Sequence, residues 1–155
     1  LRPARALIAA AAADDQEGER IRDRISNAVE NQEEHFNTLG LDLGYVYKKG
    51  MVSSDAALTP ESEVMTYTPS FTGGARLPHR TIERDGRLAS TLDLVNYNSF
   101  LSLKSGETRE IEFPTFGYSV TEVDAAELDI KDMDLDEGEY ILVRPDGHIA
   151  ARGHL

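Results

Sequence analysis

Cysteine is absent from the 155-residue sequence. Without cysteine the chain cannot form disulfides, thiolate zinc sites or iron–sulfur clusters, and it cannot carry out dithiol redox chemistry. A thioredoxin-type reductase is therefore excluded.

Long apolar runs and basic residues are also scarce. The longest apolar run, residues 4–13, is interrupted by Arg5 and is far shorter than the roughly 20 residues that cross a bilayer. Lys and Arg number 16 against 28 Asp and Glu, so the net charge of −12 repels phosphate backbones and anionic lipid. We expect no nucleic acid and no membrane among the partners, and a cytoplasmic location. The start at Leu1 reads as a truncated or processed end rather than a signal peptide, because no convincing cleavage context follows it.

The residues that are present favour an ordered α+β protein. Hydrophobic residues make up 40% and charged residues 28% of a chain with the length of one domain. Apolar side chains recur every three or four positions over residues 4–39, which predicts helix. The segment 14–18 divides this region into a short and a longer helix, because Asp favours helix N-termini and Gly18 is unfavourable inside a helix. Gly40 is expected to end the second helix.

Beyond Gly40 the pattern becomes strand-like and then irregular. Residues 41–47 alternate as a short strand does, and residues 49–80 form a long Gly- and Pro-containing connection of the kind normally held against another surface. Residues 124–137 predict one short helix or turn. Two hairpin turns are predicted, at Asp85-Gly86 and at 144–147, where Pro145 and Gly147 suit a type I turn and the left-handed residue after it. The β-like runs are 79–83, 98–103, 118–123, 140–143 and 148–151.

No catalytic or metal-binding constellation is found in the sequence. The four histidines lack any familiar ligand spacing, and the acidic run 124–139 fails as a calcium loop because Glu137 and Val143 occupy the positions that need Gly and Glu. We therefore interpret the acidic run as a solvated face. Neither G-x-S-x-G nor G-x-G-x-x-G occurs, so neither a nucleophile elbow nor a dinucleotide turn is predicted. The tyrosines could line an apolar pocket, but packing is the favoured interpretation. The histidines are His35, His79, His148 and His154.

Five short motifs occur in an order that resembles a known family. They are residues 35–47 (HFNTLGLDLGYVY), 67–70 (YTPS), 73–79 (GGARLPH), Gly86-Arg87 with 90–94 (STLDL), and 141–150 (ILVRPDGHIA). From about Gly18 to Gly153 the chain resembles the C-terminal third of FAD-dependent aromatic hydroxylases of the phenol 2-monooxygenase and polyketide hydroxylase type.

The resemblance implies an α+β architecture in three parts. Residues 1–48 would be a helical tail of the substrate domain, 49–80 an irregular connecting clasp, and 81–155 a degenerate thioredoxin-like C-terminal domain without CxxC. The segment 104–116 departs from the family pattern because it is short and partly β-like where a thioredoxin-like domain carries its first long helix. Ala151 also departs from it, since an aromatic often stands there. A complete thioredoxin topology is therefore not expected.

The resemblance also implies a function for the whole assembly. The parent enzyme would be a flavoprotein oxidoreductase, an aromatic monooxygenase that uses FAD, NAD(P)H and O2. This segment would bind no cofactor or metal and would contribute no catalytic residue; it would dock onto the flavin-binding and substrate domains, and a homodimer is a further partner left open. The alternative left open is a stand-alone small biosynthetic enzyme or ligand-binding protein, which would need a pocket around His79 and the tyrosines. The residues expected to have docking or structural roles are Arg76, Pro78, His79, Arg144, Pro145, Asp146 and Gly147.

Overall fold

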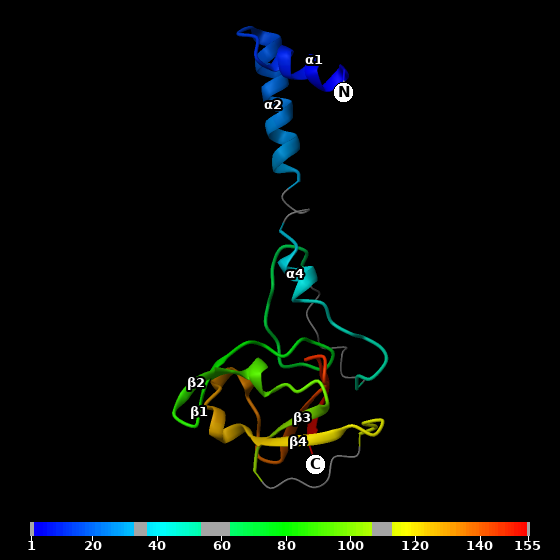
Figure 1. Cartoon of the computed structure of the whole chain (residues 1–155), viewed down its shortest axis with the longest axis vertical. Helices are drawn as coiled ribbons and strands as arrows, with labels where there is room; N and C mark the ends of the chain where they lie inside the picture. The colour runs from blue at the N-terminus through cyan, green and yellow to red at the C-terminus, as the bar shows by residue number, and fades with distance from the viewer. Residues whose placement is uncertain (1, 33–36, 54–62, 107–112, 155) are drawn as a thin grey trace. The chain divides into compact units, whose positions relative to one another are not determined.

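The computed structural model describes residues 2–32, 37–53, 63–106 and 113–154. The chain divides into two compact units, Leu1–Thr38 and Leu39–Leu155, and each is described by itself (Figure 1).

The first unit is a pair of helices, α1 (Arg2–Ala11) and α2 (Gln16–Glu30). The predicted break is confirmed: Asp15 caps α2 by accepting a hydrogen bond from the Gly18 N–H at 2.7 Å. Arg22 braces the turn by donating to the carbonyls of Ala11 and Ala13 at 2.7 and 2.9 Å. None of the helices within the described ranges is long and apolar enough to cross a membrane.

Two expectations for residues 31–48 are wrong. Helix α2 ends at Glu30, and Gly40 lies inside a separate short helix, α4 (Leu39–Asp42), instead of ending the long one. Gly40 is needed for close packing, since a Cβ there would overlap the carbonyl oxygen of Glu63. Residues 41–47 are not a strand, because they begin in α4 and then bond to the irregular segment: the Tyr47 N–H donates to the Gly74 carbonyl at 2.9 Å. His35 lies outside the described residues.

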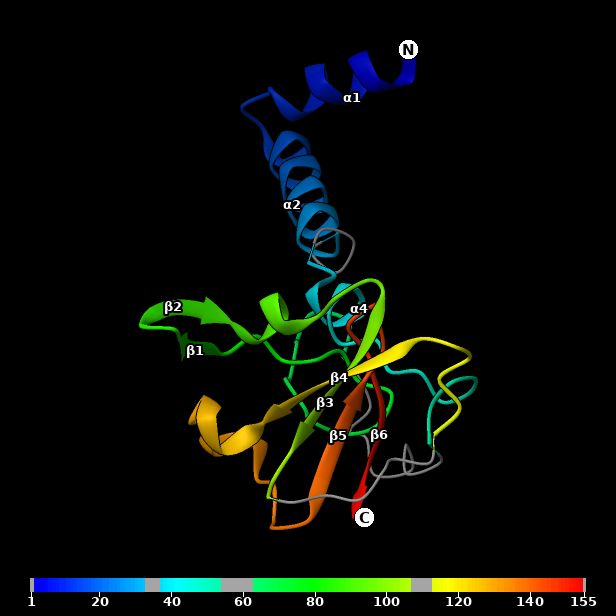
Figure 2. The same cartoon turned by 60° about the horizontal axis from the view of Figure 1, so that its bottom comes forward.

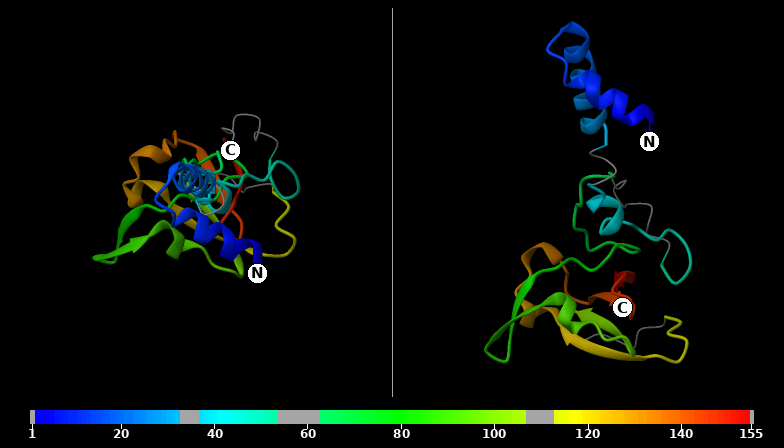
Figure 3. Two further views of the ribbon diagram at one scale, coloured as in Figure 1. Left: turned by 90° about the horizontal axis from the view of Figure 1, so that it is seen from above. Right: turned by 45° about the horizontal axis from the view of Figure 1, so that its top comes forward.

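The second unit begins its regular structure with an antiparallel hairpin of β1 (Thr81–Arg84) and β2 (Arg87–Ser90). The predicted turn at Asp85-Gly86 is confirmed, and both residues have the positive φ, 52° and 71°, that a tight hairpin requires. The β2 strand itself was not among the predicted strands. Figure 2 and Figure 3 show this hairpin projecting from the rest of the unit.

A four-stranded mixed sheet forms the centre of the second unit. Its strands are β3 (Ser99–Lys104), β4 (Ser119–Asp124), β5 (Glu139–Val143) and β6 (Ile149–His154), in the order β4-β3-β5-β6. β3 and β4 are parallel, while β5 pairs antiparallel with both β3 and β6. A parallel pair followed by an antiparallel hairpin is a thioredoxin-like order, so the α+β class and the degenerate thioredoxin-like sheet are confirmed.

Among the described residues, the helical segments beside the sheet are three short 3-10 helices. They are η2 (Thr91–Leu94), η3 (Ala125–Leu128) and η4 (Lys131–Met133), and the last two occupy the stretch predicted to hold one short helix or turn. Residues 113–118, which lead into β4, are irregular. The expected departure from thioredoxin is therefore seen in the described part of the β3–β4 connection.

Apolar side chains cover both faces of this sheet. The larger cluster includes Leu101, Ile141 and Ile149 on one face, and the smaller one includes Phe100 and Leu142 on the other. Adjacent residues of a strand face opposite sides, which explains why a run such as Ile141-Leu142 is buried throughout.

The second half of the irregular connection belongs to the same core. Phe71 and Leu77 are buried in the larger cluster, so this stretch of the connection is held against the sheet of its own unit. Its main chain lies along β6: the Gly74 N–H donates to the Ile149 carbonyl, the Ile149 N–H to the Ala75 carbonyl, and the Leu77 N–H to the Gly147 carbonyl, each at 2.8 Å. These bonds satisfy the outward-facing backbone groups at the start of this outer strand.

Replacing Gly74 should destabilise the second unit. Its φ is +86°, and a Cβ would overlap the Tyr47 carbonyl oxygen, so Gly74→Ala adds a backbone clash to left-handed strain. We expect the free energy of unfolding in urea to fall by about 2–4 kcal/mol. Gly138→Ala is the matched control, because Gly138 has φ +82° but open space around it; its loss should stay near 1 kcal/mol. Equal losses for the two variants would contradict the packing role of Gly74.

Candidate functional site

The β5–β6 turn supports the densest group of charged and aromatic side chains around the predicted docking residues. Gly147 adopts φ +82° and donates its N–H to the Arg144 carbonyl at 2.9 Å. The Asp146 carboxylate accepts the His148 N–H at 3.2 Å and pairs with the Arg144 guanidinium. The predicted hairpin is confirmed, and its turn holds Arg144 and His148 on either side of Asp146.

Tyr47 completes this group, which we call the hairpin cluster: Tyr47, Arg144, Asp146 and His148. The Arg144 guanidinium carbon lies 4.7 Å from the centre of the Tyr47 ring, within the range of a cation–π interaction. The His148 ring meets the Tyr47 ring edge-on at 4.8 Å, and Tyr45 meets it edge-on at 5.0 Å. The cluster thus ties the irregular segment after α4 to the hairpin turn.

The electrostatics of the cluster favour a neutral His148. Burial lowers the pKa of His148, and the positive charges of Arg144 and Arg76 lower it further, whereas Asp146 opposes the shift. The His148 Nδ1 atom is buried without a hydrogen-bond partner in the described residues, since the Asp146 oxygen stands 3.6 Å away. Burial alone would raise the pKa of Asp146, but bonds from Arg144 and the His148 N–H hold it below its usual value.

This geometry fits a fastening role better than a catalytic one. A general base must reach the proton that it takes, but His148 is enclosed by Tyr47 and its nearest carboxylate is already paired with Arg144. The side chains hold each other and, through Tyr47 and Arg76, the connection that precedes β1.

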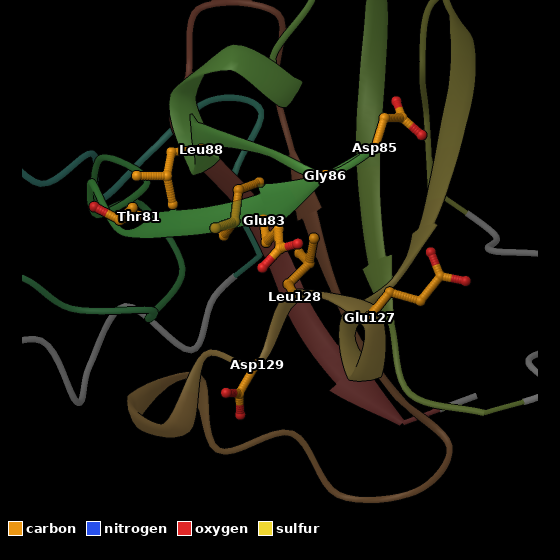
Figure 4. Close-up of a pocket in the computed structure, with 9 residues that line it drawn as sticks. Thr81, Glu83, Asp85, Gly86, Leu88, Glu127, Leu128 and Asp129 are labelled. Atoms are coloured by element: carbon orange, nitrogen blue, oxygen red, sulfur yellow. The ribbon is translucent and has the colours of Figure 1, made fainter.

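A second candidate is an acidic groove of about 490 Å³ between the β1–β2 hairpin and η3. Its lining includes Glu83, Asp85, Glu127 and Asp129. Figure 4 shows Asp85 and Glu127 turned to the same side of the groove, while Asp129 points away. No group of three or more His, Asp or Glu within the described ranges is arranged to hold a metal ion.

Several carboxylates of the acidic run have structural roles. Asp124 accepts the Ala126 N–H and caps η3, and Asp132 pairs with Arg80 beside β1. The hydrogen bonds from Arg80 hold the pKa of Asp132 below its usual value. Burial would raise the pKa of Glu139, but bonds from the Asp136 N–H and from Arg152 lower it. These side chains complement basic partners and free N–H groups rather than form a ligand site.

The predicted docking residues separate into two groups. Five lie at one junction: Arg76 forms an isolated antiparallel bridge with His148, directly beside the turn that contains Arg144. Pro78 and His79 lie instead at the base of the β1–β2 hairpin. The Pro78 carbonyl accepts a 2.6 Å bond from the buried Thr91 hydroxyl, and the His79 side chain is exposed. The junction residues are Arg76, Arg144, Pro145, Asp146 and Gly147.

The sequence did not indicate the residues that complete the junction at the β5–β6 turn and the base of the β1–β2 hairpin. Tyr47 was grouped with the other tyrosines, and His148 was seen only as the start of a strand. Nothing in their spacing indicates that they meet, because about a hundred residues separate them. Thr91 was likewise missed, although Ser90 and Asp93 around it form a capping box that could have marked η2.

The family model for the C-terminal region of aromatic-ring hydroxylases matches residues 71–154, more than half of the chain. The chain belongs to this family. The match begins at the buried Phe71 and ends in β6. Residues 74–77, both sheets and the hairpin cluster apart from Tyr47 therefore lie inside it. Comparison with curated proteins gave no match.

Three solved structures, two of them with FAD bound, are similar to this aromatic-ring hydroxylase C-terminal region. The flavin-dependent monooxygenase PieE, solved with FAD and substrate, has 27% identity and a TM-score of 0.66 over 95% of this chain. RebC-10x has 29% identity and a TM-score of 0.62 over 94%, and aklavinone-11 hydroxylase, solved with FAD and aklavinone, has 25% identity and a TM-score of 0.53 over 72%. The chain spans only 28%, 28% and 23% of these proteins.

The stability of the second unit should depend on pH through His148. Its pKa is lowered in the folded state, so below about pH 6.5 the unfolded chain takes up a proton that the folded chain resists. The free energy of unfolding should therefore fall between pH 7 and 5, by at most about 1.4 kcal/mol per pH unit. Urea unfolding across this range measures the slope, and His148→Gln should flatten it. The exposed His79→Gln is the control and should leave the slope intact. An unchanged slope in His148→Gln would show that the cluster does not hold a neutral imidazole.

Proposed function

We propose that this chain is the C-terminal structural and docking portion of an FAD-dependent monooxygenase that hydroxylates phenolic or polyketide substrates with NAD(P)H and O2. The family match and two neighbours solved with FAD, PieE and aklavinone-11 hydroxylase, support this parent activity. The chain would be the helical tail of the substrate domain followed by the clasp and the thioredoxin-like domain, in the ranges 1–48, 49–80 and 81–155.

The observation that carries the docking role is the poorly covered helical pair. Ile8 and Val29 are 67% and 66% exposed, Leu7 and Ile25 are also exposed, and Ile21 is the one large apolar side chain of this unit buried among the described residues. An amphipathic helix needs a partner that covers its apolar stripe, and α1 and α2 cover very little of each other's apolar side chains. The similarity to PieE covers 95% of the chain, which supports placing the helices in a larger protein whose other domains cover them.

The described residues do not fit FAD. The sequence has no glycine-rich strand-to-helix turn, which other flavin and dinucleotide folds use to bring backbone N–H groups to the pyrophosphate. The groove beside η3 is lined by carboxylates that would repel phosphate. We infer that FAD is held by the domains that precede this chain, and that this portion acts through the shape and stability of the assembly.

Restoring the preceding domains should restore flavin chemistry. We expect the 155-residue chain to be colourless and inactive, whereas the longer product of the same reading frame should absorb as a flavoprotein and oxidise NAD(P)H with an aromatic substrate. Absorbance spectra and oxygen uptake measure both. If the 155-residue chain alone turned over or tightly bound a phenolic or polyketide substrate, the stand-alone alternative would replace this proposal.

Charge placed on the apolar stripe should weaken docking. Val29→Asp should lower the free energy of unfolding of the longer protein by about 1–3 kcal/mol, because a carboxylate would be buried against the covering domain. In the 155-residue chain it should cost little, since Val29 is exposed there. Asn27→Asp, on the opposite side of α2, introduces the same charge and is the control. Thermal unfolding of both variants, each in the longer and in the 155-residue chain, measures these effects. Equal effects of Val29→Asp in the longer and shorter chains would contradict a docked stripe.

A further inference from the structure

The four-stranded sheet has two outer strands, and irregular segments of the chain pair with the start of one of them. Ile149 of β6 is bonded by Gly74 and Ala75, and the Ser53 N–H donates to the Ala150 carbonyl at 2.7 Å. β4 is the other outer strand, and no strand in the described part of the chain pairs with its free side. Figure 2 shows β4 beside β3, at the end of the sheet away from β6.

The free side of β4 lacks the devices that usually protect a sheet edge. Such edges are blunted by lysine, proline, bulges or charged side chains. β4 contains no lysine or proline, and its register with β3 runs unbroken over six residues. Its two carboxylates are engaged inside the unit, because Glu122 pairs with Lys104 at 2.6 Å and Asp124 caps η3. Both stand in the second half of the strand, so its first three residues, 119–121, carry no charge.

Apolar side chains gather at the start of this edge. We call Phe116, Tyr118 and Val120 the edge patch. Phe116 is 72% exposed and has φ 52°, a left-handed conformation that is strained for a bulky residue. Tyr118 packs edge-on against the buried Phe100 at 6.1 Å, and Val120 stands opposite Phe100 in the β3–β4 register. The apolar face of the sheet thus continues to the surface here.

Two occupants could cover the edge, and charge distinguishes them. A second copy would set β4 against an identical strand with two carboxylates and no basic residue, in a protein of net charge −12. Like charges across paired strands are destabilising. The similar solved structures offer another occupant, since this chain spans only 28% of PieE and of RebC-10x.

We propose that an extended segment of the preceding flavin- and substrate-binding domains pairs with the free side of β4 and covers the edge patch. Strand addition of this kind takes its affinity from main-chain hydrogen bonds and its specificity from side-chain contacts, which the edge patch would provide. The inference rests on the proposed function, because it takes its occupant from the longer enzyme.

Amide hydrogen exchange tests this pairing directly. The outward-facing amides of residues 119–123 should exchange at least about tenfold more slowly in the longer protein than in the 155-residue chain, while the β5 amides serve as an internal reference. Equal exchange of 119–123 in the two proteins would overturn the inference. Protection already present in the 155-residue chain, rising with concentration and accompanied by twice its 17.1 kDa mass in sedimentation, would identify a second copy instead and would also overturn it.

Variants of the edge patch separate this inference from the proposed function. Phe116→Asp and Val120→Asp should remove the extra protection of 119–123 in the longer protein without changing β5 exchange in the shorter one. Leu88→Asp is the control, because Leu88 is an exposed apolar residue on β2 and should leave the protection in place. Flavin absorbance is read on the same samples. If the longer protein binds flavin but the β4 amides stay unprotected, the strand-pairing inference is wrong and the proposed function stands. If the longer protein binds no flavin, the result contradicts the proposed function.

Discussion

The main chain of residues 74–77 lies along the first residues of β6 and gives the central sheet its covered edge. These hydrogen bonds place Leu77 in the larger apolar cluster and bring Gly74 against the Tyr47 carbonyl. The hairpin cluster then closes over the same junction, with Tyr47 between the Arg144 guanidinium and the His148 ring. Without this pairing β6 would be an open edge, and the segment before β1 would have no fixed course over the sheet.

The negative charge of the chain is partly used to hold it together. Asp132 ties η4 to Arg80, Asp146 orders the β5–β6 turn, and Glu139 pairs with Arg152 across the antiparallel strands. Surface ion pairs contribute little individually, so their role is mainly to orient turns whose apolar neighbours supply the stability. The acidic groove beside η3 follows from this arrangement, which leaves several carboxylates on one side of the β1–β2 hairpin. The carboxylates that line this groove would repel a phosphate group.

Two surfaces of the chain expose apolar side chains or backbone groups that have no cover within the described residues. The helical pair exposes an apolar stripe, and the sheet exposes the free side of β4 with its edge patch. The chain spans 28% of PieE and of RebC-10x and 23% of aklavinone-11 hydroxylase. Large exposed apolar patches mark interaction sites in many proteins, and this is the ground for the docking role that we propose.

The sequence by itself determined the features that depend on neighbouring residues. Asp15 as a helix cap, the Asp85-Gly86 and Arg144–Gly147 turns, the β-like runs that become β3 and β5, and the absence of a dithiol all follow from local chemistry and composition. The ordered motifs also identified the family.

Only the tertiary structure decided that Tyr47 stacks on Arg144, that residues 74–77 pair with β6, and that Gly40 and Gly74 serve close backbone contacts. Local preference was overridden at residues 41–47, where a strand-like pattern gives way to α4 and an irregular course. The physical reason is that these outcomes depend on which distant backbone groups satisfy each other's hydrogen bonds, and periodicity along the chain does not encode such partners.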